Sequence, residues 1–198
     1  MTPAKLNFKM YQGATFEQAL RWESSTKVYA PITNITKSAP VAITLADPQL
    51  QPPVGWRVRV TNAGGMKEIN MPEGTYYIAT EVANGTVYLN QINSLSYTAY
   101  SAGGVLEYNT PVSLSNYTAR LQVKRKITDT EAVLTLTTEN GGIVLDNVYK
   151  TITLKATAQQ TALLNFNSAV YDLELIDGSG KVYRFAEGSL TLKPEVTK

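Results

Sequence analysis

The sequence contains neither cysteine nor histidine. Without cysteine the chain has no disulfide, no thiol nucleophile and no thiolate metal ligand, and without histidine it has no Ser-His or Cys-His catalytic pair. The missing cysteines leave the cellular compartment open, because a cytoplasmic protein and a protein that needs no disulfide look alike in this respect. We therefore expect no enzyme, no catalytic residues, no bound metal and no cofactor.

Long hydrophobic runs and strong net charge are also lacking. No apolar run approaches the ~20 residues that span a bilayer, and residues 1–10 lack the continuous apolar stretch of a signal peptide. The chain has 18 basic and 16 acidic side chains. Because phosphate binding depends on clustered lysine and arginine, this near-balance argues against nucleic acid as a partner. We expect a soluble protein that is made in the cytoplasm and binds no membrane.

Hydrophobic residues, in contrast, make up 43% of the 198 residues, which is enough for a core in one domain or two small ones. The clearest element lies near the C-terminus, where apolar and acidic residues alternate over residues 171–175 as in a strand with one buried face. Residues 177–180 then favour a chain reversal, and residues 182–185 are predicted to pair back as a hairpin. The last strand is expected to finish at Pro194 or to run along an edge, because proline cannot donate to a ladder.

The same alternation recurs along most of the chain and predicts an all-β protein. Residues 16–22 contain helix formers, but the apolar residues on either side of Arg21 favour a strand. Residues 139–142 predict another hairpin turn between two strands. A helical turn is expected only at residues 157–164, where a threonine precedes alanine, glutamine and leucine.

The middle of the chain, residues 31–111, has the features of an inserted domain. It begins and ends at prolines and has its own hairpin signal at Asn84 and Gly85. Its own apolar set consists of Trp56, Val58, Val60, Ile78, Val82, Val87 and Leu89. We predict a small β domain at 31–111, placed in a surface loop of a domain formed by residues 1–30 and 112–198. The core of that outer domain is expected to include Phe16, Leu20, Trp22, Tyr117, Leu121, Tyr171, Leu173 and Leu175.

Two kinds of possible anion site have a structural alternative. Gly64-Gly65 and Gly103-Gly104 do not have the spacing of a phosphate-binding loop and lead into no predicted helix, so they are interpreted as turn glycines. The basic run at residues 124–126 follows a predicted strand, and three charges favour a solvated strand end over a phosphate site.

The acidic pairs and the aromatic residues likewise have a structural alternative. Asp172 with Glu174, or Glu17 with Glu23, could suggest the acid/base pair of a glycosidase. Carboxylates two residues apart on a strand share its solvent face, and we favour that interpretation. The twelve tyrosines and two tryptophans could form a carbohydrate platform, but most of them occupy positions predicted to face inward.

Three segments carry a family resemblance when they are taken in order. They are residues 11–16 with Leu20 and Trp22, residues 114–124 with Gly141-Gly142-Ile143, and residues 171–175 with Gly188 and residues 194–197. Together they resemble the small β-sandwich domain of tailed-phage structural proteins, found at the N-terminus of baseplate upper proteins and as stand-alone virion proteins. The resemblance covers about residues 5–30 and 112–198. It implies an antiparallel β-sandwich.

The middle region has a resemblance of its own. Residues 64–70, 76–78 and 97–104 are similar to a small β-barrel-like module of phage tail proteins, which is named after the first catalytic cysteine half-domain of ubiquitin-activating enzymes. The name implies no catalysis here, because a chain without cysteine cannot perform thioester transfer. The insertion of about eighty residues between the first and second core strands departs from the sandwich family.

These resemblances imply a non-enzymatic virion protein of a tailed bacteriophage that is made in the host cytoplasm. The leading expectation is a tail or baseplate adaptor that joins the tail to fibres or neighbouring subunits, in several symmetric copies. The alternatives are a capsid decoration or head-fibre protein and, in a different class, a glycan-binding receptor module. The edge at residues 190–196, protected only by Lys193, Pro194 and Glu195, or the insert, is expected to contact another virion subunit.

Overall fold

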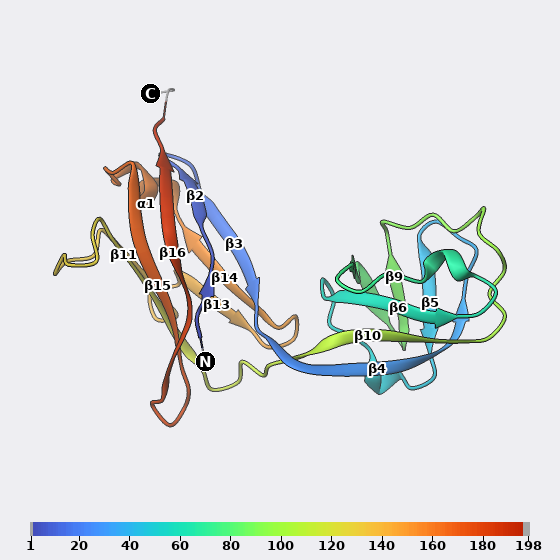
Figure 1. Ribbon diagram of the computed structural model, residues 1–198. Coiled ribbons are helices and arrows are strands. Elements are labelled where there is room, and N and C mark those ends of the chain that lie inside the picture. The colour runs from blue at the N-terminus through green and yellow to red at the C-terminus, as the bar shows by residue number, and fades with distance from the viewer. Residues whose placement is uncertain (1, 196–198) are drawn as a thin grey trace. The chain divides into compact units, whose positions relative to one another are not determined.

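The computed structural model describes residues 2–195 and consists mainly of β-strands (Figure 1). The all-β class predicted from the sequence is confirmed. The chain divides into two compact units. We call the first the sandwich unit, with described residues 2–21 and 113–195, and the second the inserted unit, with residues 22–112.

Among the described residues, the sandwich unit contains a six-stranded sheet and a three-stranded sheet. In the larger sheet the order is β1, β16, β15, β11, β12, and β2 also pairs with β16. Its strands are β1 (Ala4–Lys5), β2 (Phe8–Tyr11), β11 (Thr118–Lys124), β12 (Leu134–Thr137), β15 (Ser168–Ile176) and β16 (Val182–Lys193). The smaller sheet contains β13 (Ile143–Asp146), β14 (Thr151–Ala156) and β3 (Phe16–Arg21), in that order.

The β15–β16 hairpin forms as predicted. Tyr171, Leu173 and Leu175 are buried on one face of β15. The turn is organised by Asp177, whose Oδ1 accepts hydrogen bonds from the backbone N–H groups of Ser179 (2.9 Å) and Lys181 (3.1 Å). An aspartate side chain that bonds its own backbone in this way stabilises a reversal.

The two sheets of the sandwich unit meet through aromatic side chains near the N-terminus. The Phe8 ring of the larger sheet lies 5.0 Å from that of Tyr171 and 6.1 Å from that of Phe16, which belongs to the smaller sheet. Leu121 and Tyr171 of the predicted core are buried, whereas Phe16, Leu20 and Tyr117 are half-buried.

The predicted helical turn is confirmed as α1 (Ala158–Ala162). It begins with a capping box, in which Thr157 accepts from the N–H of Gln160 and Gln160 accepts from the N–H of Thr157. Thr161 is fully buried, and its hydroxyl donates to the carbonyl of Ala14 at 2.8 Å. This bond ties the helix to the segment between β2 and β3.

The expected free edge at residues 190–196 is wrong for the part that is described. Residues Leu190 to Lys193 of β16 pair in parallel with Phe8 to Tyr11 of β2, so their backbone groups already have a neighbouring strand. Strand β16 does end before Pro194, as predicted, and residue 196 lies outside the described residues. The sequence pattern missed the pairing because the two strands are far apart along the chain.

The turn at residues 139–142 does not make the expected hairpin. Strand β12 pairs with β11, whereas β13 pairs with β14 in the other sheet. The turn is held by Asn140, whose Oδ1 accepts from the N–H of Thr137 (2.8 Å) and the N–H of Gly142 (2.9 Å). The turn residues correctly predicted a chain reversal, but the reversal takes the chain from β12 in the larger sheet to β13 in the smaller sheet.

Seven strands form one sheet in the inserted unit, all of whose residues, 22–112, are described. The order is β7, β6, β10, β4, β5, β9, β8. Their bounds are β4 (Glu23–Ile35), β5 (Val41–Leu45), β6 (Arg57–Ala63), β7 (Tyr77–Ile78), β8 (Glu81–Ala83), β9 (Thr86–Leu89) and β10 (Gly103–Pro111). Two short 3-10 helices, η1 (Pro48–Leu50) and η2 (Lys67–Ile69), lie in the connections.

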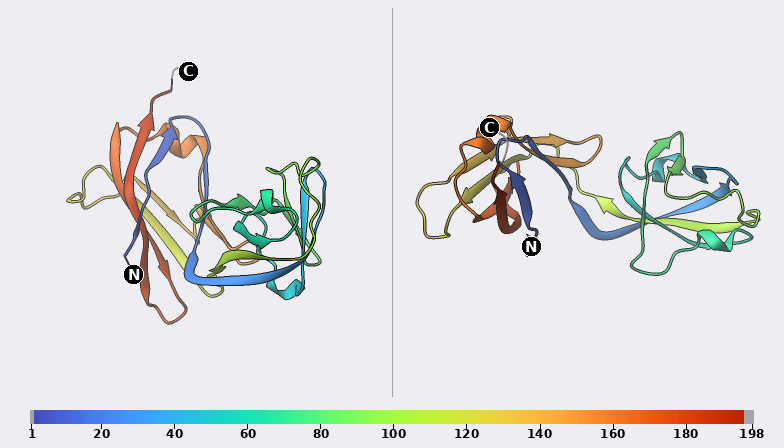
Figure 2. Two further views of the ribbon diagram at one scale, coloured as in Figure 1. Left: turned by 45° about the vertical axis from the view of Figure 1, so that its right-hand side comes forward. Right: turned by 90° about the horizontal axis from the view of Figure 1, so that it is seen from above.

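This sheet curls, and its two end strands adjoin in sequence (Figure 2). Only Ala79 and Thr80 separate β7 from β8. The N–H of Ala79 donates to Trp56 beside β6, whereas the N–H of Thr80 donates to Tyr88 of β9, both at 2.9 Å. Consecutive residues thus bond to the two opposite ends of the sheet path, which gives the barrel-like form.

The hairpin signal at Asn84 and Gly85 is confirmed between β8 and β9. Both residues have positive φ, 51° and 78°. A two-residue turn with two positive φ angles matches the twist of the flanking strands, which is why Asn-Gly is favoured there.

The boundary between the units lies at residues 21/22 and 112/113, whereas the sequence placed the first boundary at 30/31. Residues 22–30, including Trp22, belong to the inserted unit because β4 pairs with β10 from the Glu23–Pro111 pair to the Pro31–Val105 pair. Pro31, which marked the expected boundary, lies within β4.

Replacing residues 22–112 by a short Gly/Ser linker should leave a sandwich unit that unfolds cooperatively. The ends to be joined are neighbours, since the N–H of Val112 donates to the carbonyl of Trp22 at 3.0 Å, and loop-closure entropy changes only slowly with length. Thermal unfolding followed by far-ultraviolet circular dichroism is the measurement. Loss of the cooperative transition would mean that the two units share one core.

Residues 22–112 produced alone provide the matched control. Both tryptophans of the sequence, Trp22 and Trp56, lie in this segment, so their fluorescence reports on the inserted unit alone. We expect a blue-shifted emission that shifts to the red in one transition on denaturation, because Trp56 is fully buried.

Candidate functional site

The outward face of β6, β10 and β4 carries a cluster of ion-paired side chains. The strand register places Arg59 opposite Glu107, and Glu107 opposite Tyr29. The neighbouring residues Val58, Val60, Leu106 and Tyr108 are buried in the core. Because side chains alternate along a strand, Arg59, Glu107 and Tyr29 stand together on the other face.

Glu107 is only 5% exposed although it lies on this outward face. Its Oε1 lies 2.6 Å from Arg59 Nε and 3.1 Å from Lys27 Nζ. Lys27 makes a hydrogen bond, whereas the Arg59 Nε–H does not have hydrogen-bond geometry and the contact is an ion pair. Burial alone opposes ionisation of the carboxyl, but the two cations outweigh it and hold the pKa of Glu107 below its usual value.

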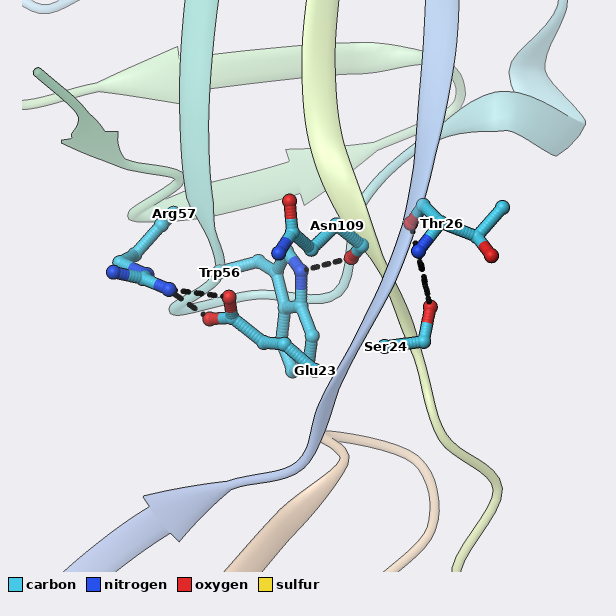
Figure 3. A network of polar contacts seen from close by, with 6 residues as sticks. All are labelled: Glu23, Ser24, Thr26, Trp56, Arg57 and Asn109. Carbon is cyan, nitrogen blue, oxygen red and sulfur yellow. Dashed lines mark hydrogen bonds and ion pairs between the residues drawn. The ribbon is translucent and has the colours of Figure 1, made fainter. Parts of the chain in front are cut away.

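A second ion pair lies where the chain enters the inserted unit through β4 and leaves it through β10 (Figure 3). Arg57 donates from Nε to Glu23 Oε1 at 3.0 Å and from a terminal nitrogen to Oε2 at 2.5 Å. Beside this fork, the indole Nε1 of Trp56 donates to the carbonyl of Asn109 at 2.7 Å. Trp56 thereby contacts β10, and the adjacent Arg57 contacts β4.

Two exposed aromatic rings accompany these charges. Tyr29 is 59% exposed and Tyr76 is 40% exposed, and the guanidinium of Arg57 lies over the Tyr76 ring, 5.1 Å from its centroid. We call this surface the Tyr29 face and define it by Lys27, Tyr29, Arg57, Arg59, Tyr76 and Glu107. Tyrosine and arginine are the residue types that most often supply binding energy at protein interfaces.

The sequence did not single out the Tyr29 face, and it predicted that most tyrosines face inward. Only Tyr108 and Tyr171 of the twelve are buried, so that prediction is wrong. The sequence pattern could have indicated that Tyr29 faces outward, because Tyr29 stands between the apolar residues Val28 and Ala30, which are half-buried and buried. The buried Tyr108 hydroxyl donates to the carbonyl of Leu50 at 2.9 Å, and burial raises its pKa to about 12.

The two glycine pairs lie at one end of the β6–β10 ladder, as turn glycines would. Gly103 is opposite Ala63, and the N–H of Gly64 donates to the carbonyl of Ala102 at 2.8 Å. Gly65 has a φ of +74°, and a Cβ placed on it would lie 2.2 Å from a backbone oxygen. Close packing of two chain segments explains these glycines.

The acidic pairs considered from the sequence each have cationic neighbours. Asp172 and Glu174 both project from β15, where Asp172 lies 3.5 Å from Arg184 and Glu174 lies 2.7 Å from Arg120.

Glu17 and Glu23 belong to different units. Glu17 of the sandwich unit pairs with Lys155 at 3.4 Å, and Glu23 is held by Arg57.

The basic run at residues 124–126 begins at the last residue of β11, so the predicted strand end is confirmed. Arg125 donates from Nε to the carbonyl of Asn165 at 3.4 Å. Lys124 is half-buried and contributes to a groove on the sandwich unit.

Comparison with known proteins gives no family assignment: no family model and no curated protein sequence matches the chain. No helix within residues 2–195 is long and apolar enough to cross a membrane.

A Glu107→Gln substitution should destabilise the inserted unit by about 1–3 kcal/mol at neutral pH, because it removes the anion that compensates two cations in a covered site. Urea unfolding followed by tryptophan fluorescence measures the difference. Glu81→Gln is the matched control, since Glu81 is an exposed carboxylate of the same unit, and it should leave the unfolding midpoint unchanged.

The pH dependence provides a second test of the same ion pairs. Because the pKa of Glu107 is lower in the folded than in the unfolded state, its stabilising contribution is present above about pH 4.3 and is lost as the pH falls through the folded value. The stability gap between wild type and Glu107→Gln should therefore narrow in acid. A gap that stays constant down to the acid transition would contradict the ionised state of Glu107.

Proposed function

We propose that this chain is a non-enzymatic structural protein of a tailed-phage virion, an adaptor in the tail or baseplate that joins neighbouring subunits or fibres. The sequence resemblance of the sandwich segments to phage structural proteins motivates the proposal. The observation that carries it is the insertion of one compact β unit into another through a pair of hydrogen-bonded strands. Such a chain can offer two separate contact surfaces while both units remain covalently tied at two points.

The Tyr29 face provides the contact surface of the inserted unit in this proposal. Its ion pairs hold Arg57 and Arg59 in place before a partner arrives, so little side-chain entropy is lost when the surface is covered. Tyr29 itself remains exposed and can be buried against a neighbouring virion subunit. Several copies around a symmetry axis would repeat this contact.

The location in the virion is tested by counting copies in purified particles of the phage that encodes the chain. An adaptor should be present in tens of copies and should fractionate with isolated tails. Hundreds of copies on tail-less heads would overturn the adaptor and support a capsid decoration or head-fibre protein. Quantitative mass spectrometry against a labelled standard of the chain supplies the numbers.

The Tyr29→Ala variant tests the contact surface. It should fold normally, because the side chain is exposed, but its incorporation into virions should fall well below that of wild type. Tyr149→Ala is the matched control, since Tyr149 is also more than half exposed and lies on the sandwich unit. Equal incorporation of all three proteins would rule out this face as the assembly contact.

A glycan array separates the third possibility, a receptor module that stacks sugars on Tyr29 and Tyr76. If the chain is an adaptor, we expect no glycan binding that requires the Tyr29 and Tyr76 rings. A glycan bound by wild type and lost in Tyr29→Ala would replace the adaptor by a receptor-binding function.

A further inference from the structure

The sandwich unit has a groove of about 540 Å³ on the outward face of its larger sheet. It crosses the strands, because its lining residues come from β1, β16, β15 and β11 and from the loop that follows β11. The register forms one continuous row, with Lys5 opposite Glu187, Glu187 opposite Asp172 and Asp172 opposite Gln122. A second row, two residues along, pairs Lys124 with Val170.

The acidic groups in this groove already share a cation. Arg184 lies 3.5 Å from Asp172 and 3.9 Å from Glu187. Within residues 2–195, by contrast, neither Lys5 nor Lys124 forms an ion pair. The groove therefore has a lysine at each end whose charge is not compensated by a direct contact.

Amide groups add further hydrogen-bond donors. The Oδ1 atom of Asn7 accepts from both the N–H and the hydroxyl of Ser189. No hydrogen bond of its Nδ2 group is found within residues 2–195, so the two N–H bonds of this amide remain available as donors in the groove lining. A ligand that matches these groups must supply acceptors, and carboxylates make the stronger, charge-assisted bonds to lysine.

Two exposed apolar side chains lie toward the Lys124 end of the groove. Val170 is 39% exposed and Ile127, in the loop after β11, is 85% exposed, and both line the groove. An aliphatic side chain placed here would remove both from water, which is favourable in proportion to the apolar area covered.

We infer that this groove binds an extended acidic peptide segment of another protein, with carboxylates toward Lys5 and Lys124 and an aliphatic side chain between them. Lys5 and Lys124 are three strand spacings and two residues apart, about 16 Å. In an extended peptide, residues four apart lie on one face about 13 Å from each other, and the lysine side chains can span the rest. The motif that fits is glutamate, any residue, valine, any residue, glutamate.

A nucleic acid fits the groove less well than this peptide. A phosphodiester chain carries a charge at every nucleotide, so some phosphates would face Asp172 and Glu187 in the lining, whereas the peptide has carboxylates only at its two ends. Single-stranded nucleic acids also depend on exposed aromatic rings for stacking, and the one aromatic residue in the lining, Tyr171, is 4% exposed.

The inference does not depend on the virion role, because it concerns only what the sandwich unit can bind. It is tested with the full chain and a fluorescein-labelled peptide of sequence glutamate-serine-valine-serine-glutamate, by fluorescence anisotropy. We expect saturable binding that weakens as salt is raised, since exposed charge pairs are screened. Replacing both glutamates of the peptide by glutamine should abolish most of the binding.

Variants of the chain locate the site. Lys5→Gln and Lys124→Gln should each weaken binding by up to about fivefold, and Ile127→Ala should weaken it by a similar factor without affecting the fold. Lys67→Gln, an exposed lysine of the inserted unit, is the matched control and should bind like wild type.

Three results would overturn the inference. The first is no saturable binding of the glutamate peptide to the wild-type chain. The second is equal affinity of the wild type, Lys5→Gln and Lys124→Gln for that peptide. The third is binding of a thymidine oligonucleotide that is tighter than peptide binding and is lost in the same lysine variants, which would make the groove a polyanion site.

Discussion

The pairing of β4 with β10 is the interaction on which the arrangement of the whole chain depends. These two strands carry the chain out of the sandwich unit and back into it, and their ladder runs from the Glu23–Pro111 pair to the Pro31–Val105 pair. The ladder brings the two ends of residues 22–112 together. For the sandwich unit, the inserted segment is therefore equivalent to a closed surface loop. Each unit can then bury its apolar residues within itself.

The side chains of the β6 segment reinforce this ladder at its open end. Trp56 reaches the backbone of β10, and Arg57 holds a carboxylate of β4. The buried indole needs a hydrogen-bond partner for its N–H, and the carbonyl of Asn109 supplies it. Further along, Glu107 forms ion pairs with both Lys27 and Arg59, so the outward face of the same three strands is held by charge, while the inward face is held by apolar packing.

Local patterns predicted the elements that form between neighbours in sequence. The β15–β16 hairpin, the Asn84-Gly85 turn and the capped helix at Thr157 each depend on residues a few positions apart, and all three are present. The parallel pairing of β2 with β16 could not be predicted in this way. The two strands are separated by most of the chain, and local turn residues do not determine which distant strands pair.

The sequence by itself determined the all-β class, because alternation with a period of two is a property of each strand alone. It also restricted the possible chemistry, since the absence of cysteine and histidine is independent of folding. Only the tertiary structure decided where the units divide, which tyrosines are exposed, and that Lys5 and Lys124 border one groove. These features depend on which strands pair across long separations, and that choice is made by packing and hydrogen bonding of the whole chain.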